Sequence, residues 1–196
     1  MKAIETHYNG YRFRSRLEAR WAVFFDTLGI RYEYEPEGFE MDLCGSDGTV
    51  TIRYLPDFYI PDFKLYGEVK PAGSRGEIDA EDMERMSWFI DYGGPLSNGL
   101  IFLGYIPNPN NTWLFEYAIL RWHGKGLEWG YAQADDSGIP DMKSFFNVGY
   151  YSAPISFGKE DDLVLTTTGA GDDEAALPRI SKALTAARQA RFEFNR

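Results

Sequence analysis

The sequence predicts an α/β fold in which a helix, three strands, a second helix and a further strand follow one another within the first 106 residues. Three observations predict it. An apolar stripe with helical spacing runs through residues 14–28, and β-rich runs separated by turn signals occupy 39–70. An amphipathic segment at 78–92 then precedes a short apolar run at 99–106, which is typical of a buried strand.

The first helix is expected over residues 14–28. Ser15 is its expected N-cap, Glu18 follows at the spacing of a capping box, and Gly29 is expected to end the helix. The segment 31–35 and a loop with Pro36 come next. Strands are then expected at 39–43, 49–58 and 64–70.

The chain after residue 106 is expected to extend the same domain. Residues 107–177 form a β-rich acidic extension, with strands at 112–122 and 127–133 around a hairpin turn and a turn-rich stretch from 134 onward. Residues 178–196 form a basic C-terminal helix that begins near Pro178. The expected organisation is therefore a core at 1–106, the extension and this helix.

Several classes of protein are excluded by composition. Cys44 is the single cysteine, which excludes an intramolecular disulfide and an all-thiolate zinc site. No apolar run approaches ~20 residues, and the first residues lack the apolar core of a signal peptide. We therefore expect a soluble, cytoplasmic protein with no membrane partner.

Charge is distributed unevenly along the chain. The net charge of −10 argues against a general nucleic-acid binder. However, residues 1–31 carry six Lys and Arg against three acids, residues 178–196 carry five against one, and residues 71–177 carry six against seventeen. Either the two basic ends fold into one positive face, or the solvated charges are simply uneven.

Four ionisable residues lie at positions suited to a catalytic or metal-binding site. Asp57 lies at a strand end, and Glu68 and Lys70 lie two apart on the next strand, so they share a face. Two carboxylates brought together across a hairpin offer hard oxygen ligands for Mg²⁺ or Mn²⁺, and a water on such a metal can act as a nucleophile. The lysine can orient or deprotonate that water, or offset charge on a phosphate. Glu18 adds a third carboxylate if the first helix packs beside the hairpin.

The pattern of Asp57 followed by Glu68, Val69 and Lys70 resembles the PD-(D/E)XK nuclease superfamily. Its restriction-endonuclease-like fold has a mixed four-stranded sheet in an α-β-β-β-α-β order, here with a β-rich insertion and a C-terminal helix. The stretch from 14 to 71 also resembles small phage and bacterial proteins of that superfamily. The position of Glu18 is similar to that in transposon-end-cleaving nucleases and archaeal Holliday-junction resolvases.

The resemblance implies a role for each of these residues. Asp57 and Glu68 would hold Mg²⁺ or Mn²⁺, the Val69 carbonyl would contribute to the metal, Lys70 would be the catalytic lysine, and Glu18 would be a further ligand. The implied activity is metal-dependent hydrolysis of phosphodiester bonds, with DNA as the expected substrate and RNA as the alternative. A bacterial or phage-infected cell is the implied setting.

Each assignment has a structural alternative. The alternative for Glu18 is that it serves only the cap at Ser15. Pro61-Asp62 is a second Pro-Asp pair, although Asp57 ends the better strand. Glu68 and Lys70 are either catalytic or part of an exposed strand edge. At the level of the whole chain, the alternative is a catalytically silent nuclease-fold module that binds a protein or a nucleic acid, with the acidic extension as its docking surface. A homodimer is a further open possibility.

Basic residues at both ends are candidates for phosphate contacts, with a solvated helix face as the alternative. They are Arg12, Arg14, Arg16, Arg20, Lys182, Arg188 and Arg191. Aromatic residues between 112 and 151 are interpreted as core, with a base-stacking surface as the alternative. The two histidines and the glycines at 169–171 are not interpreted as sites.

Overall fold

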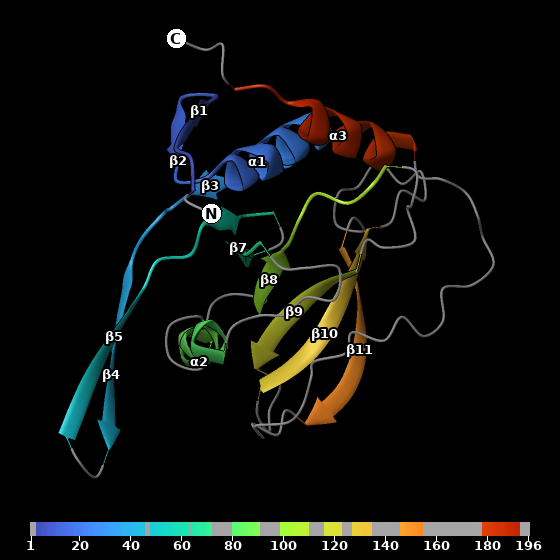
Figure 1. The fold of residues 1–196 in the computed structure, drawn as a ribbon. Coiled ribbons are helices and arrows are strands. Elements are labelled where there is room, and N and C mark those ends of the chain that lie inside the picture. The colour runs from blue at the N-terminus through green and yellow to red at the C-terminus, as the bar shows by residue number, and fades with distance from the viewer. Residues whose placement is uncertain are drawn as a thin grey trace.

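A computed structural model gives the fold, which is mixed α/β with helices on both faces of a seven-stranded sheet (Figure 1). The structure describes residues 3–45, 48–62, 64–71, 80–90, 99–109, 116–122, 127–134, 146–154 and 178–192. The strand order is β11-β10-β9-β8-β7-β6-β3. Neighbouring strands are antiparallel except β7 and β8, which are parallel.

Four strands of this sheet come from the first 106 residues. They are β3 (Glu33–Tyr34), β6 (Phe58–Ile60), β7 (Leu65–Val69) and β8 (Gly99–Leu103). The other three extend the sheet beyond β8 and are β9 (Glu116–Trp122), β10 (Leu127–Ala134) and β11 (Phe146–Pro154). The extension therefore continues the sheet of the first 106 residues.

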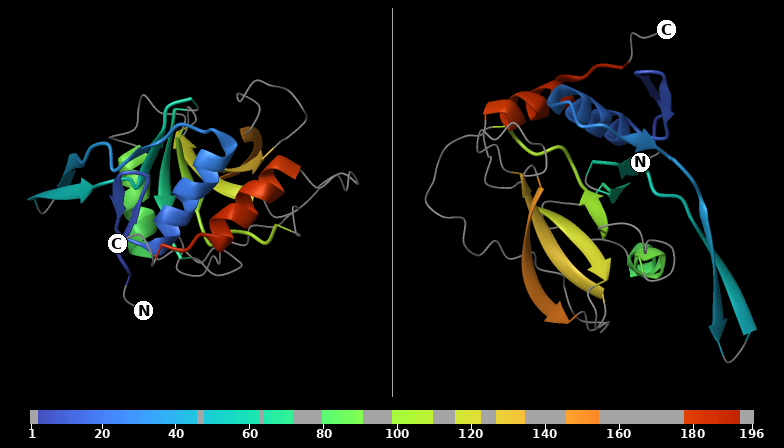
Figure 2. Two further views of the ribbon diagram at one scale, coloured as in Figure 1. Left: turned by 90° about the horizontal axis from the view of Figure 1, so that it is seen from above. Right: turned by 180° about the vertical axis from the view of Figure 1, so that it is seen from behind.

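Helix α1 (Arg16–Leu28) begins and ends as its sequence predicts. Ser15 is the N-cap, and its side chain accepts a hydrogen bond from the Glu18 backbone N–H at 3.1 Å. Gly29 closes the helix in the left-handed conformation at φ 73°, which a residue with a side chain rarely adopts. Helix α3 (Pro178–Gln189) packs beside α1, as the two directions of view show (Figure 2).

The two faces of the sheet bury separate clusters. Leu65, Val69, Ile101 and Leu103 pack with residues of α1 and α3, whereas the residues that alternate with them pack with α2 (Ala80–Trp88). This alternation follows from the pleat, which sends successive side chains to opposite faces. On β7 it places Val69 on the side of α1 and Glu68 on the side of α2.

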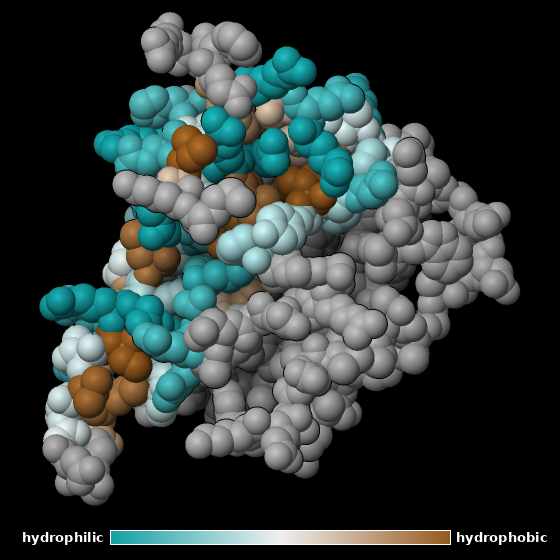
Figure 3. Space-filling view, in the orientation of Figure 1, coloured by the Kyte–Doolittle hydropathy of each residue, from teal (hydrophilic) through white to brown (hydrophobic). Residues whose placement is uncertain are grey.

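Two short ribbons stand apart from the main sheet. β1 (Thr6–Tyr8) and β2 (Tyr11–Phe13) form a hairpin through Asn9 and Gly10, both at positive φ. β4 (Phe39–Gly45) and β5 (Gly48–Tyr54) form a longer ribbon that extends away from the main sheet (Figure 1), and its Met41 and Tyr54 share a buried cluster with Met86 of α2. Hydrophobic side chains gather on this ribbon at the lower left of Figure 3. Val50 on β5 is 63% exposed.

Three predictions about strands need correction. The single strand expected at 49–58 is wrong, because β5 ends at Tyr54 and β6 begins at Phe58, with Pro56 interrupting the ladder between them. The segment 39–43 pairs with β5 in the separate ribbon, and the short β3 takes a place in the main sheet. The turn-rich interpretation of 134–177 is wrong over 146–154, where β11 forms; the glycines at 169–171 lie outside the described residues.

Other predicted elements are confirmed with narrower bounds. Helix α2 lies within the segment 78–92, and β8 lies within 99–106. β9 and β10 pair antiparallel with Trp122 opposite Leu127, as two strands of a hairpin do, and the turn expected at 123–126 lies outside the described residues. Within the described ranges, no helix is long and apolar enough to cross a bilayer.

Candidate active site

A pocket of about 450 Å³ opens where the N-terminal end of α1, the start of β6, the end of β7 and α2 meet. It contains all five residues expected from the sequence to form the catalytic and metal-binding set. Its lining consists of Arg14, Glu18, Arg53, Tyr54, Leu55, Asp57, Glu68, Val69, Lys70, Asp82, Arg85 and Met86.

Asp57 lies in the pocket directly before β6 and is only 3% exposed. Its Oδ2 accepts a hydrogen bond from the Val69 backbone N–H at 2.7 Å, which ties it to the neighbouring strand β7. Its Oδ1 accepts from the Arg14 guanidinium at 2.5 Å. Each oxygen therefore has one protein donor and retains acceptor capacity, because a carboxylate oxygen carries two lone pairs.

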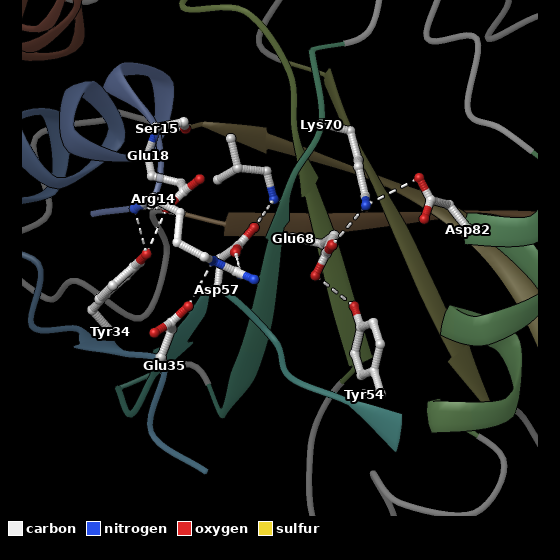
Figure 4. Close-up of polar contacts among 11 residues, drawn as sticks. Arg14, Ser15, Glu18, Tyr34, Glu35, Tyr54, Asp57, Glu68, Lys70 and Asp82 are labelled. Atoms are coloured by element: carbon white, nitrogen blue, oxygen red, sulfur yellow. Dashed lines mark hydrogen bonds and ion pairs between the residues drawn. The ribbon is translucent and has the colours of Figure 1, made fainter. Parts of the chain in front are cut away.

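Glu68 and Lys70 meet on the α2 side of β7 (Figure 4). The Lys70 Nζ lies 3.1 Å from Glu68 Oε1 and 3.0 Å from Asp82 Oδ2 on α2. The other oxygen of Glu68 accepts from the Tyr54 hydroxyl at 2.7 Å. Because Glu68 is 7% exposed, the interpretation of this pair as an exposed strand edge is wrong.

Glu18 reaches the same pocket from the first turn of α1. Its Oε2 accepts from the Tyr34 hydroxyl at 2.6 Å and from the Arg14 backbone N–H at 3.0 Å. The carboxylate thus bonds to the residue before the cap instead of closing a capping box on Ser15. The cap uses the backbone of Glu18, so its side chain, 6% exposed, is available to the pocket.

Burial and mutual repulsion control the protonation of the acid pair. Burial, and then the negative charge of Glu68, raise the pKa of Asp57 to about 8, against the lowering effects of the Val69 N–H and Arg14. Burial also raises the pKa of Glu68, although Tyr54 and Lys70 oppose that rise. Near neutral pH the pair therefore carries less than its full negative charge.

The two cations in contact with the acids stay protonated. Burial lowers the pKa of Lys70, but the neighbouring Glu68 and Asp82 outweigh it, so the pKa is raised overall. Burial likewise opposes the charge of Arg14, whose pKa is nevertheless raised by Asp57 and Glu35. Arg14 bridges these two acids, with its Nε 2.7 Å from Glu35 Oε1.

Asp62, the alternative to Asp57, lies elsewhere. Its carboxylate pairs with Arg31 and does not line the pocket. The choice of Asp57 over Asp62 therefore agrees with the arrangement of the pocket.

Of the seven basic residues expected to contact phosphates, Arg14 alone lines the pocket. Arg12 pairs with Glu5 at the surface, and Arg188 donates to the Ile106 carbonyl, which ties α3 to the segment after β8. Arg16 and Arg20 are partly buried on α1, whereas Lys182 and Arg191 on and after α3 are exposed. Phosphate contacts by these six residues stay predictions.

The sequence did not single out Tyr34, Tyr54, Asp82, Arg53 or Arg85. Tyr54 and Arg53 on β5 and Asp82 and Arg85 on α2 line the pocket, whereas Tyr34 on β3 donates to Glu18, which lines it. Tyr54 had a local signal, since it lies three residues before Asp57 at the end of a segment rich in β-branched residues. The others had none, because their position depends on contacts between distant elements.

Within the part of the chain that the structure describes, no three His, Cys, Asp or Glu side chains form a ready-made metal cluster. His123, Trp113 and Phe115 lie outside the described residues, so their interpretation is untested.

Comparisons with protein-family models, with curated proteins and with solved structures find no match.

Proposed function

We propose that this chain is a metal-dependent nuclease that hydrolyses phosphodiester bonds, with DNA as its expected substrate. The observation that carries the proposal is the pocket in which the buried carboxylates of Asp57 and Glu68 lie beside the ammonium of Lys70. Buried acids without enough counter-charge are unfavourable for stability and are common where chemistry is performed.

The order of elements supports a restriction-endonuclease-like core. Along the chain, α1 is followed by three strands of the main sheet, β3, β6 and β7. Helix α2 comes next, and then β8, which pairs parallel with β7. This is a helix, three strands, a helix and a strand, as the resemblance implies. The β4–β5 ribbon is then an insertion before the strand that follows Asp57, and β9–β11 are an extension at the far edge.

The donor set fits a small divalent cation. Asp57 and Glu68 would hold Mg²⁺ or Mn²⁺, with the Val69 carbonyl and Glu18 as further oxygen donors. Mg²⁺ is usually held by one or two carboxylates and keeps several waters, so a pair of acids is sufficient. A cation also offsets the burial and the repulsion from Glu68 that raise the pKa of Asp57, because it favours the ionised form of both acids. When bound, such a metal supplies positive charge at the phosphate and makes a coordinated water more acidic.

Lys70 acts in this proposal as a positive charge. Its ammonium is held between Glu68 and Asp82 and keeps its proton, so it donates a hydrogen bond and stabilises negative charge that develops on the phosphate. Arg14 holds Asp57 in place and presents a half-exposed guanidinium to the same pocket. In the hydrolysis, a water oxygen bonds to phosphorus, one phosphorus–sugar oxygen bond breaks, and the departing oxygen receives a proton.

The test is cleavage of plasmid, linear and single-stranded DNA and of RNA, with Mg²⁺, Mn²⁺ or EDTA. We expect metal-dependent cleavage that Asp57→Asn and Lys70→Met each reduce at least a hundredfold. Asp62→Asn and Lys64→Met are the matched controls, because Asp62 belongs to the second Pro-Asp pair and, like the exposed Lys64, lies outside the pocket. Cleavage that survives Asp57→Asn, or that proceeds in EDTA, contradicts the proposal.

A second readout does not depend on activity. Mg²⁺ binding to the native pocket raises the melting temperature, and the gain is larger at pH 8 than at pH 6 because the cation competes with the proton on Asp57. Asp57→Asn removes the gain, whereas Asp62→Asn retains it. Nucleic-acid binding without metal binding or cleavage favours the silent binding module instead.

A further inference from the structure

Two arginines of the pocket have no role in the arrangement of its acids. Arg53 comes from β5 of the ribbon and Arg85 comes from α2, and both line the pocket that contains Asp57 and Glu68. Arg14 and Lys70 differ from them, because their charges are held by Asp57, Glu35, Glu68 and Asp82. Among the basic residues that line the described pocket, Arg53 and Arg85 are therefore the two whose ion pairs are not with acids of the pocket.

Both arginines are paired with exposed acids that do not line the pocket. The Arg53 Nε lies 2.7 Å from Glu40 Oε1, and these side chains are 77% and 64% exposed. Arg85 pairs with Glu81 one turn earlier on α2, with exposures of 49% and 72%. Ion pairs at such exposed positions are weak, so a phosphate can replace the glutamate at small cost. A guanidinium also binds phosphate oxygens with two parallel hydrogen bonds.

We propose that Arg53 and Arg85 bind phosphate groups of a nucleic-acid strand whose scissile phosphate lies in the pocket. This inference rests on the proposed nuclease function and assigns its substrate contacts. Two guanidiniums from separate elements fit a ligand with several phosphates, such as a polynucleotide strand. A mononucleotide has a single phosphate group and would contact fewer guanidiniums than a strand does.

The experiment measures binding of fluorescently labelled single-stranded DNA by anisotropy, in EDTA so that the strand stays intact, across a range of salt concentrations. Arg53→Gln and Arg85→Gln are each expected to weaken binding about fivefold near 0.1 M salt and to reduce the slope of log affinity against log salt by about 0.7. Thymidine monophosphate is expected to compete poorly. Arg31→Gln is the matched control, because Arg31 is 75% exposed and paired with Asp62 away from the pocket.

Removal of the acidic partners gives the opposite result. Glu40→Gln and Glu81→Gln release the arginines and are expected to tighten binding and leave the melting temperature within a few degrees of the original. A purely structural role for these pairs would weaken the fold in all four variants and tighten nothing. Loss of binding through unfolding is therefore distinguished from loss of phosphate contacts.

The outcomes separate this inference from the proposed function. If Arg53→Gln and Arg85→Gln keep the affinity and slope of Arg31→Gln, the inference is wrong, even if the protein cuts DNA with Mg²⁺. If both variants lower the slope while no cleavage of any substrate is seen, the phosphate contacts stand and the nuclease proposal fails.

Discussion

Asp57→Asn is expected to change how stability depends on pH. Burial and the charge of Glu68 raise the pKa of Asp57 from 3.8 to about 8 in the native protein, so the folded state binds this proton more tightly than the unfolded chain does. The stabilisation from this proton is fully present below about pH 4 and is lost as the pH rises through about 8. Without added metal, the protein should therefore be less stable at pH 7 than at pH 5.

The magnitude follows from linkage. Between pH 5 and pH 7 the carboxyl is largely ionised in the unfolded chain and largely protonated in the fold, and each pH unit then removes about 1.4 kcal/mol. Two units remove about 2–3 kcal/mol, which for a chain of 196 residues lowers the melting temperature by about 5–10 °C. The pKa of Glu68 is raised as well, and its contribution has the same sign.

The assay is urea unfolding in EDTA at pH 5, 6 and 7. The amide introduced by Asp57→Asn retains one oxygen to accept the Val69 N–H and carries no titratable proton, so the variant lacks the protonation step that makes the stability of the original protein depend on pH. The informative quantity is the slope of the unfolding free energy against pH, which should be flatter in Asp57→Asn than in the original protein.

In the control Asp62→Asn, the slope between pH 5 and pH 7 should not change. The hydrogen bond from Arg31 lowers the pKa of Asp62, so its contribution is lost only as the pH falls below this range. Equal slopes for Asp57→Asn and the original protein would refute the reasoning.

Three further changes test the supports of the pocket. Tyr54→Phe removes the hydroxyl that donates to Glu68 at 2.7 Å; we expect about 1 kcal/mol less stability in urea unfolding and a further rise in the pKa of Glu68, which NMR titration can follow. Gly67→Ala puts a methyl group 3.3 Å from both Leu103 Cδ1 and Phe58 Cβ, and the overpacking should cost about 1–3 kcal/mol by the same assay, whereas an unchanged midpoint would show that the sheet relaxes. Ser15→Ala removes the N-cap of α1, which should cost about 1 kcal/mol and lower the melting temperature by about 2–4 °C in a calorimetric scan.

The sequence predicted those parts of the fold that depend on local patterns. The cap at Ser15, the left-handed Gly29 and the apolar stripe of α1 act over a few residues, and all three appear in the structure. The division of residues 49–58 into two strands was missed, since residues that favour strands lie on both sides of Pro56 and the pairing partners differ. β5 pairs with β4 in the ribbon and β6 pairs with β7 in the main sheet, and such a choice between partners has no local signature.

In the site, too, some residues were predictable from neighbouring sequence and others are placed by contacts between distant elements. Glu68 and Lys70 share a face because they are two apart on one strand, and their neighbour Val69 fixes Asp57 through its backbone. Asp82 had no such signal, because it meets Lys70 only after α2 packs on the sheet through Met86 and Phe89. The acids that would hold the metal were therefore predictable, whereas the groups that hold and orient them depend on tertiary contacts.

The acidic character of the chain does not conflict with a polyanionic substrate. The net charge is −10, yet the ionisable residues that line the pocket are four acids and four bases. A proton on Asp57 leaves this set with a net charge of about +1 near neutral pH, and a divalent cation on the ionised pair raises it to about +2. Glu40 and Glu81, which pair with Arg53 and Arg85 at exposed positions, lie outside this set, so a phosphate meets these two cations once it replaces the glutamates, while the negative charges elsewhere repel the rest of the strand. Binding should accordingly depend on local contacts at the pocket, and this is why single arginines there are expected to change the affinity measurably.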